Sequence, residues 1–358
     1  MKIIQILPTI SYGDAVGNDT VALYHTLKKE GYETAIYAEN IDSRLKNSDI
    51  RRISELPKLS ESDVALYHLS TGTKLNYELE KLPCRKIIVY HNVTPPHFFE
   101  GYSEVSRELC TQGLLGVGHL AGCVDYCLAD SSYNRNELIR MGYQCEIDVL
   151  PILIPFDDYK KTPSKKILNR YDDGEYTNIL FTGRIAPNKK QEDVIEAFYY
   201  YNKYINPKSR LFIVGSYGGM EKYYNELQAY ADKLGLKNVF FTGHIKFDEI
   251  LAYYKTADLF LCMSEHEGFC VPLVEAMFFD VPIVAFDSSA IADTLGGSGF
   301  LLKKKDGKEA AEVMHRILTD EKLREDILYN QRLRLQDFAH DTIETMFLEY
   351  LRKFISNR

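Results

Sequence analysis

Short apolar runs rich in β-branched residues alternate along the chain with longer segments whose apolar residues recur at helical spacing. Runs that are apolar at nearly every position and end in turn residues are typical of parallel strands buried on both faces. The pattern predicts strands at 2–7, 34–38, 64–68, 86–91, 125–129 and 147–150, and again at 178–182, 210–214, 238–242, 258–263 and 282–286. This βαβα order, which occurs twice, predicts an α/β fold with two Rossmann-like parallel sheets.

The helical patterns and the breaks between them indicate two domains. Helices are expected at 19–30, 191–205, 220–234 and 272–279, with an amphipathic helix at 341–353. A segment bounded by prolines, 151–155, ends the first series of strands. We therefore expect an N-terminal domain of residues 1–152, a C-terminal domain of residues 153–340 and a terminal segment, 341–358. The length of 358 residues suits two domains of ordinary size.

Charge and cysteine content narrow the function classes. The formal net charge of -8 argues against nucleic-acid binding as the main function. The seven cysteines are dispersed without a CxxC pair, which disfavours a zinc site and suits a reducing cytoplasm. No run of 18 apolar residues predicts a membrane span. We expect a cytoplasmic protein and leave open peripheral contact with the inner face of the membrane through a local basic surface.

The segment 267–275, Glu-Gly-Phe-Cys-Val-Pro-Leu-Val-Glu, follows the strand predicted at 258–263 directly. Pro272 suits the first turn of a helix, where its missing N–H costs nothing. The backbone amides of Phe269, Cys270 and Val271 would then lie at the positive helix end and could bind an anion. Glu267 in the loop and Glu275 in the first turn would flank this site, and carboxylates suit sugar hydroxyls. A plain helix N-terminus with ordinary acidic residues is the alternative.

The segment 181–191 follows the first strand of the second domain and contains Gly183, Arg184 and Lys189. Glycine allows a tight turn, and the two cations could neutralise a diphosphate leaving group. Lys190 could take the role of Lys189, and a solvated basic loop is the alternative.

Two glycines, Gly13 and Gly17, follow the first strand, where they would permit close backbone approach to a ligand. Their GxxxG spacing does not meet the GxGxxG dinucleotide fingerprint. Glu39, at the end of the second strand, could mimic the ribose-binding acid of that fingerprint, so a dehydrogenase remains an alternative.

His91 ends the strand predicted at 86–91, from which it could bind a sugar or transfer a proton. A structural histidine is the alternative, and His68 shares this ambiguity with a weaker case. The spacing of His97, His119 and His266 does not suggest a metal cluster, so no metal site is predicted.

Taken together, these motifs resemble the family 4 retaining glycosyltransferases of the GT-B fold. The resemblance covers nearly the whole chain and is carried in the second domain by Gly183-Arg184…Lys189, Val214-Gly215, Thr242-Gly243 and Glu267…Glu275-Ala276-Met277. The first domain adds Gly13…Gly17, His91 and the segment 129–138, Ala-Asp-Ser-Ser-Tyr-Asn-Arg-Asn-Glu-Leu. The context of residues 266–273 is similar to that of bacterial lipopolysaccharide and exopolysaccharide mannosyltransferases. Asp14, Cys270 and Asp280 stand where glycine is common in the family.

The resemblance implies two Rossmann-like domains whose sheets face a central cleft, with the C-terminal helix of 341–358 packed on the N-terminal domain. It implies that Arg184 and Lys189 bind the donor diphosphate and that Glu275 binds the ribose. Glu267 would hold the donor sugar, assisted by the backbone from Gly268 to Val271. The loop containing His244 would touch the base, His91 would lie beside the reacting sugar, and Gly13 and Gly17 would approach the phosphates.

The function implied is transfer of a hexose, with mannose favoured, from a nucleoside-diphosphate sugar to a glycan or lipid-linked acceptor with anomeric retention. No cofactor and no catalytic metal are expected, because cationic side chains would offset the charge of the leaving group. Two alternatives remain open. One is an epimerase or phosphorylase of the GT-B fold, and the other is a noncatalytic partner subunit that binds nucleotide sugar.

Overall fold

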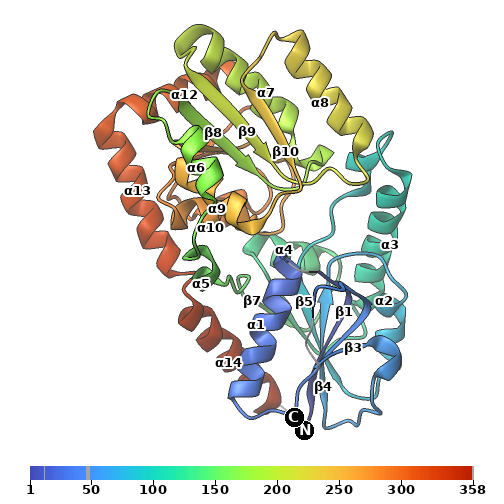
Figure 1. Ribbon diagram of the computed structural model, residues 1–358. Coiled ribbons are helices and arrows are strands. Elements are labelled where there is room, and N and C mark those ends of the chain that lie inside the picture. The colour runs from blue at the N-terminus through green and yellow to red at the C-terminus, as the bar shows by residue number, and fades with distance from the viewer. Residues whose placement is uncertain (12, 46–48, 357–358) are drawn as a thin grey trace. The chain divides into compact units, whose positions relative to one another are not determined.

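The computed structural model describes residues 1–11, 13–45 and 49–356, which form two compact α/β units (Figure 1). Unit 1 contains Met1–His97, Val105–Phe156 and Asp337–Arg358. Unit 2 contains Phe98–Glu104 and Asp157–Gln336.

Unit 1 is built on a seven-stranded parallel sheet with the order β3-β2-β1-β4-β5-β6-β7. Its strands are β1 Ile3–Ile10, β2 Ile36–Ile41, β3 Ile50–Arg52, β4 Val64–Leu69, β5 Arg85–Tyr90, β6 Tyr126–Ala129 and β7 Glu146–Val149. Its α-helices are α1 Ala15–Lys29, α2 Leu75–Glu78, α3 Glu104–Leu120, α4 Ser132–Arg140 and the terminal α14 His340–Ser356. The short helix α5 Phe156–Tyr159 begins at the last residue of this part of unit 1, and its other three residues belong to unit 2. Short 3₁₀ turns are η1 Ile53–Glu55, η2 Leu79–Lys81 and η3 Pro96–Phe99.

Successive residues of these strands enter different cores, because side chains alternate across a sheet. Ile4 and Ile6 pack into a cluster that includes side chains of α2, α3 and α4. Ile3 packs instead with side chains of α1 and α14. Both faces of the sheet are therefore covered by helices, which explains why its strands are apolar at nearly every position.

Unit 2 contains a six-stranded parallel sheet with the order β10-β9-β8-β11-β12-β13. Its strands are β8 Thr177–Thr182, β9 Ser209–Val214, β10 Val239–Gly243, β11 Leu259–Cys262, β12 Ile283–Phe286 and β13 Phe300–Leu302. The α-helices are α6 Lys165–Tyr171, α7 Gln191–Tyr200, α8 Glu221–Lys233, α9 Phe247–Thr256, α10 Val271–Phe278, α11 Ile291–Leu295, α12 Gly307–Thr319 and α13 Glu321–Gln336. A 3₁₀ turn, η4 Pro187–Lys189, precedes α7, and a π-helical turn, η5 Tyr201–Ile205, follows it.

The second sheet is also covered on both faces. Ile179 and Phe181 of β8 pack with apolar residues of α7, α8 and α12. On the other face Phe212 lies against Tyr171 of α6 and Tyr253 of α9, with ring centroids 4.7 and 5.0 Å apart. Aromatic side chains thus fill this second interface between sheet and helices.

The predicted α/β class with two parallel sheets is confirmed. The edge strands β3 and β13 were not predicted, because each has three residues and only Leu302 among them is buried. The first helix was predicted too late in the chain. It begins at Ala15, because the Asp14 side chain accepts a hydrogen bond from the Gly17 amide at 2.6 Å and caps the helix.

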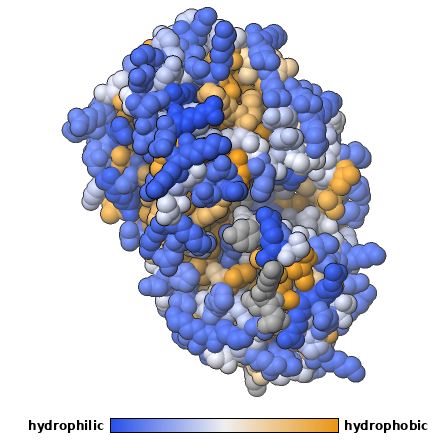
Figure 2. Space-filling view, viewed as in Figure 1, coloured by the Kyte–Doolittle hydropathy of each residue, from blue (hydrophilic) through white to orange (hydrophobic). Residues whose placement is uncertain are grey.

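Most atoms on the face shown in Figure 2 belong to hydrophilic residues, while the largest apolar side chains lie in the cores. In the part of the chain that the structure describes, no helix combines the length and hydropathy that a membrane crossing requires.

The helix α14 packs on unit 1 through Ile343, Phe347, Leu351 and Phe354, all of which are buried at helical spacing. We predict that Phe347→Ala lowers the free energy of unfolding of unit 1 by about 3–5 kcal/mol, because it leaves a cavity in a packed core. Denaturant unfolding with hydrogen exchange as the readout measures this. The exposed neighbour Glu349 supplies the control Glu349→Ala, and equal effects of the two substitutions would contradict the packing described.

Candidate functional site

The loops after β8 and β11 leave the second sheet at the point where its strand order reverses. From β8 the chain proceeds to β9 on one side of the sheet, whereas β11 lies on the other side of β8. In open parallel sheets the carboxyl ends of the strands at such a switch point form the ligand-binding crevice. Both charged motifs of the second domain lie in these two loops, 183–190 and 263–270.

The two loops are joined by an ion pair between Lys189 and Glu267. The Lys189 Nζ lies 2.5 Å from Glu267 Oε2, and the side chains are 22% and 8% exposed. Asn188 reinforces the junction, because its carbonyl accepts from the Glu265 amide at 2.8 Å and its Nδ2 donates to the His266 carbonyl at 3.0 Å. The sequence-predicted cation and carboxylate are thus brought together.

Lys189 remains charged in this position. Burial alone would lower the pKa of Lys189, but the Glu267 carboxylate, together with the neighbouring Cys270 and Cys262, raises it overall. An ammonium group has three donors and one goes to Glu267, so two can serve a ligand. Lys190 instead pairs with Glu192 and Glu265, at 3.4 and 3.6 Å. The geometry therefore favours Lys189 over Lys190 as the cation of the site.

The start of α10 forms the next part of the site. Glu267 is fixed by its own backbone, whose amide donates to Ser289 Oγ at 2.8 Å. The Phe269 carbonyl accepts a hydrogen bond from the Thr294 hydroxyl. Val271 and Pro272 lie in the first turn of α10, Cys270 is its N-cap residue, and Gly268 lies in the loop before it. The partial positive charge of the helix end therefore lies beside Glu267.

Cys270 and Asp280 adopt left-handed backbone conformations, with φ of 74° and 53°. Glycine reaches this region without steric cost, which accounts for its frequency at these positions in the resembling family. Asp280 is held there by Arg332, whose Nε donates to Asp280 Oδ1 at 2.7 Å. The turn after α10 therefore forms without glycine.

Three side chains near the ion pair could ligate a cation. Cys262, Glu267 and Cys270 each offer one ligand atom, and these atoms lie within 4.8 Å of one another. Thiolates favour soft metal ions. In the structure the Lys189 ammonium pairs with the Glu267 carboxylate and compensates its negative charge.

Glu275 is held by two tyrosines. Its Oε1 accepts from the Tyr159 hydroxyl at 2.9 Å and its Oε2 accepts from the Tyr254 hydroxyl at 2.7 Å. Burial raises the pKa of Glu275 despite these hydrogen bonds. A carboxylate offers about four acceptor positions, so about two remain for hydroxyl groups of a ligand.

Arg184 and His244 are both exposed after their strands. The Arg184 guanidinium donates to the Gly218 carbonyl through Nη2 at 3.3 Å. Gly183, at φ 142°, packs so closely on Gly215 that a Cβ on Gly215 would lie 1.9 Å from the Gly183 carbonyl oxygen. These two glycines let the loops after β8 and β9 touch, which positions Arg184 at the edge of the sheet.

In unit 1, Gly13 and Gly17 have different structural roles. Gly13 has a φ of 79° and forms the turn after β1. Gly17 was expected in a loop but lies in the first turns of α1, where a Cβ would meet the Ser11 carbonyl oxygen at 2.6 Å. A side chain at position 17 would therefore clash with the segment after β1, which explains why glycine stands there.

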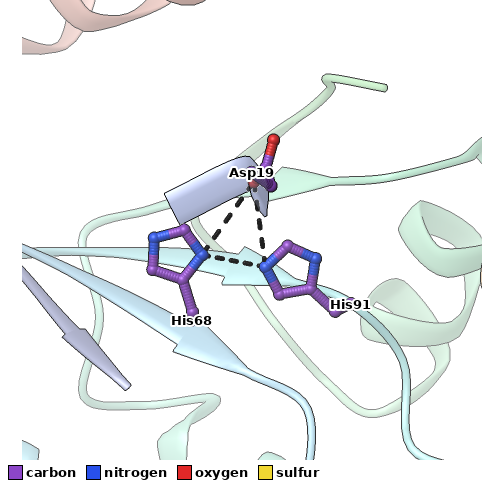
Figure 3. Close-up of side chains that lie close together, drawn as sticks. All are labelled: Asp19, His68 and His91. Atoms are coloured by element: carbon purple, nitrogen blue, oxygen red, sulfur yellow. Dashed lines mark hydrogen bonds and ion pairs between the residues drawn. The ribbon is translucent and has the colours of Figure 1, made fainter. Parts of the chain in front are cut away.

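His91 follows β5, and its side chain is 2% exposed. Its Nδ1 lies 2.9 Å from Asp130 Oδ2 and its Nε2 lies 2.8 Å from His68 Nδ1. The Asp19 Oδ2 is 4.0 Å from the facing nitrogen of each ring (Figure 3). Both nitrogens of His91 thus have partners inside unit 1, and the ring as it stands offers no unpartnered nitrogen to a sugar.

Sequence reasoning did not identify Tyr159, Tyr254 and Asn188, which contact the predicted site residues. Asp130 could have been predicted from the sequence, because it directly follows β6 in the segment Ala129-Asp-Ser-Ser. Tyr159 had no detectable signal, since it lies in a polar stretch 116 residues before Glu275.

Comparison with known proteins identifies one part of the chain. Residues 163–334 match the family "Glycosyl transferases group 1". This segment is therefore similar to group 1 glycosyl transferases. It contains both loops described above and the helix α10. The resemblance to GT-B glycosyltransferases of family 4 is thereby confirmed.

Relatives of the chain include the capsular polysaccharide biosynthesis glycosyltransferase CapM of Staphylococcus aureus, 28% identical over 188 residues, which are 49% of this chain and 47% of CapM. A GDP-mannose-dependent α-(1-6)-phosphatidylinositol monomannoside mannosyltransferase of Mycobacterium tuberculosis is 26% identical over 203 residues, covering 53% of this chain and 51% of that protein. The chain thus spans about half the length of the curated relatives it matches.

Solved structures similar to the whole chain support the GT-B fold. Sucrose-phosphate synthase from Thermosynechococcus elongatus has a TM-score of 0.79 with 15% identity, covering 100% of both chains. Anabaena HepE in complex with UDP-glucose has a TM-score of 0.75 with 18% identity, covering 99% of this chain and 100% of that one.

The ion pair between Lys189 and Glu267 yields a stability prediction. Lys189→Met leaves the buried Glu267 charge without compensation, so we expect a loss of about 3 kcal/mol in the free energy of unfolding of unit 2. The double variant Lys189→Met/Glu267→Gln should be more stable than Lys189→Met alone. Denaturant unfolding measures both.

The matched control is Lys190→Met, which removes the adjacent lysine and its longer ion pairs and should cost less than about 1 kcal/mol. Equal destabilisation by Lys189→Met and Lys190→Met, or no recovery in the double variant, would contradict the role assigned to the pair.

Proposed function

We propose that this protein is a retaining glycosyltransferase that moves a hexose, with mannose favoured, from a nucleoside-diphosphate sugar to a glycan or lipid-linked acceptor. The observation that carries the proposal is the Lys189–Glu267 ion pair, which lies at the switch point of a glycosyl transferase domain. A charged lysine with donors to spare suits a diphosphate, and the neighbouring carboxylate suits sugar hydroxyls.

The surrounding residues complete the donor site in this proposal. Lys189, Arg184 and the N-terminal end of α10 bind the diphosphate, the last through the backbone around Phe269. Glu275 accepts the ribose hydroxyls with the positions that Tyr159 and Tyr254 leave unused. Glu267 orients the donor sugar. His244 follows β10 and contributes to the base site through its loop.

The reaction breaks the bond between the anomeric carbon and the diphosphate oxygen and forms a bond from that carbon to the acceptor oxygen. The acceptor attacks the face from which the diphosphate leaves, and a phosphate oxygen takes the acceptor proton. Lys189 and Arg184 offset the negative charge that develops on the leaving group, a role that divalent cations play in other transferases. The proposed chemistry therefore uses no metal.

Mannose is favoured as the donor sugar because several relatives are described as mannosyltransferases, among them the GDP-mannose-dependent enzyme of Mycobacterium tuberculosis and the O-antigen chain mannosyltransferase B of Escherichia coli, which is 23% identical over 202 residues. A cell-surface glycan or a lipid-linked intermediate is the proposed acceptor for the same reason.

Release of free nucleoside diphosphate from a panel of GDP- and UDP-sugars tests the proposal without knowledge of the acceptor. We expect one donor to be cleaved slowly by water. Glu267→Ala should lower that rate by about 10²–10³-fold, because it removes a preorganised group at the reacting sugar. The control Glu265→Ala removes a neighbouring carboxylate that pairs with Lys305 and should retain the rate. An epimerised nucleotide sugar as the product would contradict a transferase.

Stereochemistry and metal dependence test the mechanism. Once an acceptor is found, proton NMR of the product should show the donor's anomeric configuration. Turnover should persist in excess EDTA, because lysine and arginine supply the positive charge. An inverted product, or complete loss of turnover in EDTA that added divalent cation restores, would overturn the mechanism.

A further inference from the structure

The hydrogen bonds of unit 1 fix the protonation of two buried histidines. Gln5 Nε2 donates to the Thr20 carbonyl at 2.9 Å, so the amide oxygen Oε1 must be the atom that faces His68, 2.8 Å from His68 Nε2. An amide oxygen only accepts hydrogen bonds, so His68 Nε2 carries a hydrogen. A neutral imidazole has one N–H, which leaves a lone pair on His68 Nδ1.

That lone pair faces His91. The His68 Nδ1 and the His91 Nε2 are 2.8 Å apart, while the ring centroids are 5.2 Å apart and the planes differ by 5°. The distance between the centroids exceeds the distance between the nitrogens by about two ring radii. The two rings therefore face each other edge to edge through these nitrogens and are not stacked face to face, as Figure 3 shows. Two lone pairs pointing at each other at this distance would repel. His91 Nε2 therefore carries the hydrogen that His68 accepts.

The other nitrogen of His91 faces a carboxylate. Asp130 Oδ2 lies 2.9 Å from His91 Nδ1, and both side chains are 2% exposed. A carboxylate accepts, so His91 Nδ1 also carries a hydrogen. We infer that His91 is held as a buried imidazolium by Asp130 on one side and by the Gln5–His68 pair on the other. Asp130, His68 and Gln5 are thus positioning residues that act through His91.

The charges around His91 are consistent with this assignment. Burial alone would lower the pKa of His91, but the carboxylates of Asp130, Asp19 and Asp14 together raise it, with Asp130 contributing most among them. Burial, followed by the His91 charge, lowers the pKa of His68 well below its usual range. Burial raises the pKa of Asp130 and raises that of Asp19 to about 7. One histidine is therefore charged and the other neutral.

The same atoms resemble a cation site, because Asp19, His68 and His91 offer ligand atoms within 4.8 Å of one another. A ligating histidine needs a lone pair on the nitrogen that faces the ion. In the end-to-end arrangement His91 Nε2 has no lone pair to give. The geometry points to a proton between the rings.

The functional consequence rests on the proposed function. Asp14, whose charge acts on His91, caps α1 in the loop that the resemblance associates with the donor phosphates. The buried positive charge of His91 near the loop after β1 favours the binding of an anionic ligand, such as a phosphate, at that loop. Since the folded pKa of His91 lies above its usual value, the charge is present below about pH 6.5 and is lost as the pH rises through the folded pKa. Donor cleavage should fall over the same range.

The protonation is measured directly by NMR of the full-length protein labelled with ¹⁵N-histidine, with His91→Gln and His68→Gln to assign the two rings among nine histidines. Below about pH 6.5 we expect both nitrogens of His91 to be protonated and His68 to be the neutral Nε2–H tautomer. A neutral His91, or a protonated Nδ1 on His68, would overturn the inference.

Asp130→Asn tests the positioning role, because it keeps the shape but removes the charge. His91 should then lose its proton at lower pH in the NMR titration, and the alkaline decline of donor cleavage should move to lower pH by the same amount. Asp148→Asn, which removes a carboxylate that accepts from Tyr126, is the control and should change neither. An unchanged His91 titration in Asp130→Asn would refute the inference.

The NMR result does not depend on catalysis. If no donor is cleaved, the proposed function fails while the imidazolium assignment is still decided by the spectra.

Discussion

The ion pair between Lys189 and Glu267 fixes how the second unit can use the carboxyl edge of its sheet. β8 and β11 are neighbours in the sheet, although 76 residues of the chain lie between Thr182, where β8 ends, and Leu259, where β11 begins. The pair joins the loops that follow them, and Asn188 bonds the same loops through their backbones. A cation and a carboxylate are therefore held at the start of α10, whose helix end adds a partial positive charge. In the proposed function, Arg184 adds a second cation for the diphosphate and Glu275 accepts the hydroxyl groups of the ribose.

Unit 1 differs from unit 2 in that its charged and polar groups form a chain of buried hydrogen bonds and not a single ion pair between two loops. Its strand ends carry a chain of buried hydrogen bonds from Gln5 through His68 and His91 to Asp130. Buried polar groups at such density are stable only when each is satisfied, and here each histidine nitrogen has a partner. The resemblance places His91 beside the reacting sugar. Since both nitrogens of His91 are already hydrogen-bonded within unit 1, we infer that His91 acts through its positive charge.

The sequence predicted the fold because strands buried on both faces are apolar throughout, and that signal does not depend on tertiary context. It failed for β3 and β13, whose three residues each are mostly exposed. Site residues in single motifs, such as Glu267 and Glu275, were named from local pattern. Tyr159 and Tyr254 were not, because only folding brings them to Glu275. The choice between Lys189 and Lys190 likewise needed the path of η4, which directs one lysine to Glu267 and the next to Glu192 and Glu265.

In the proposed function, the loops after β8 and β11 bind a nucleoside diphosphate through lysine and arginine. Calorimetric titration with GDP and UDP in excess EDTA tests it most directly, with the wild type and Arg184→Ala measured together. We expect one nucleoside diphosphate to bind without divalent cations and the corresponding nucleoside monophosphate to bind more weakly. Arg184→Ala should reduce the affinity by about tenfold or more. Absence of binding by both nucleotides, or binding that Arg184→Ala leaves unchanged, would contradict it.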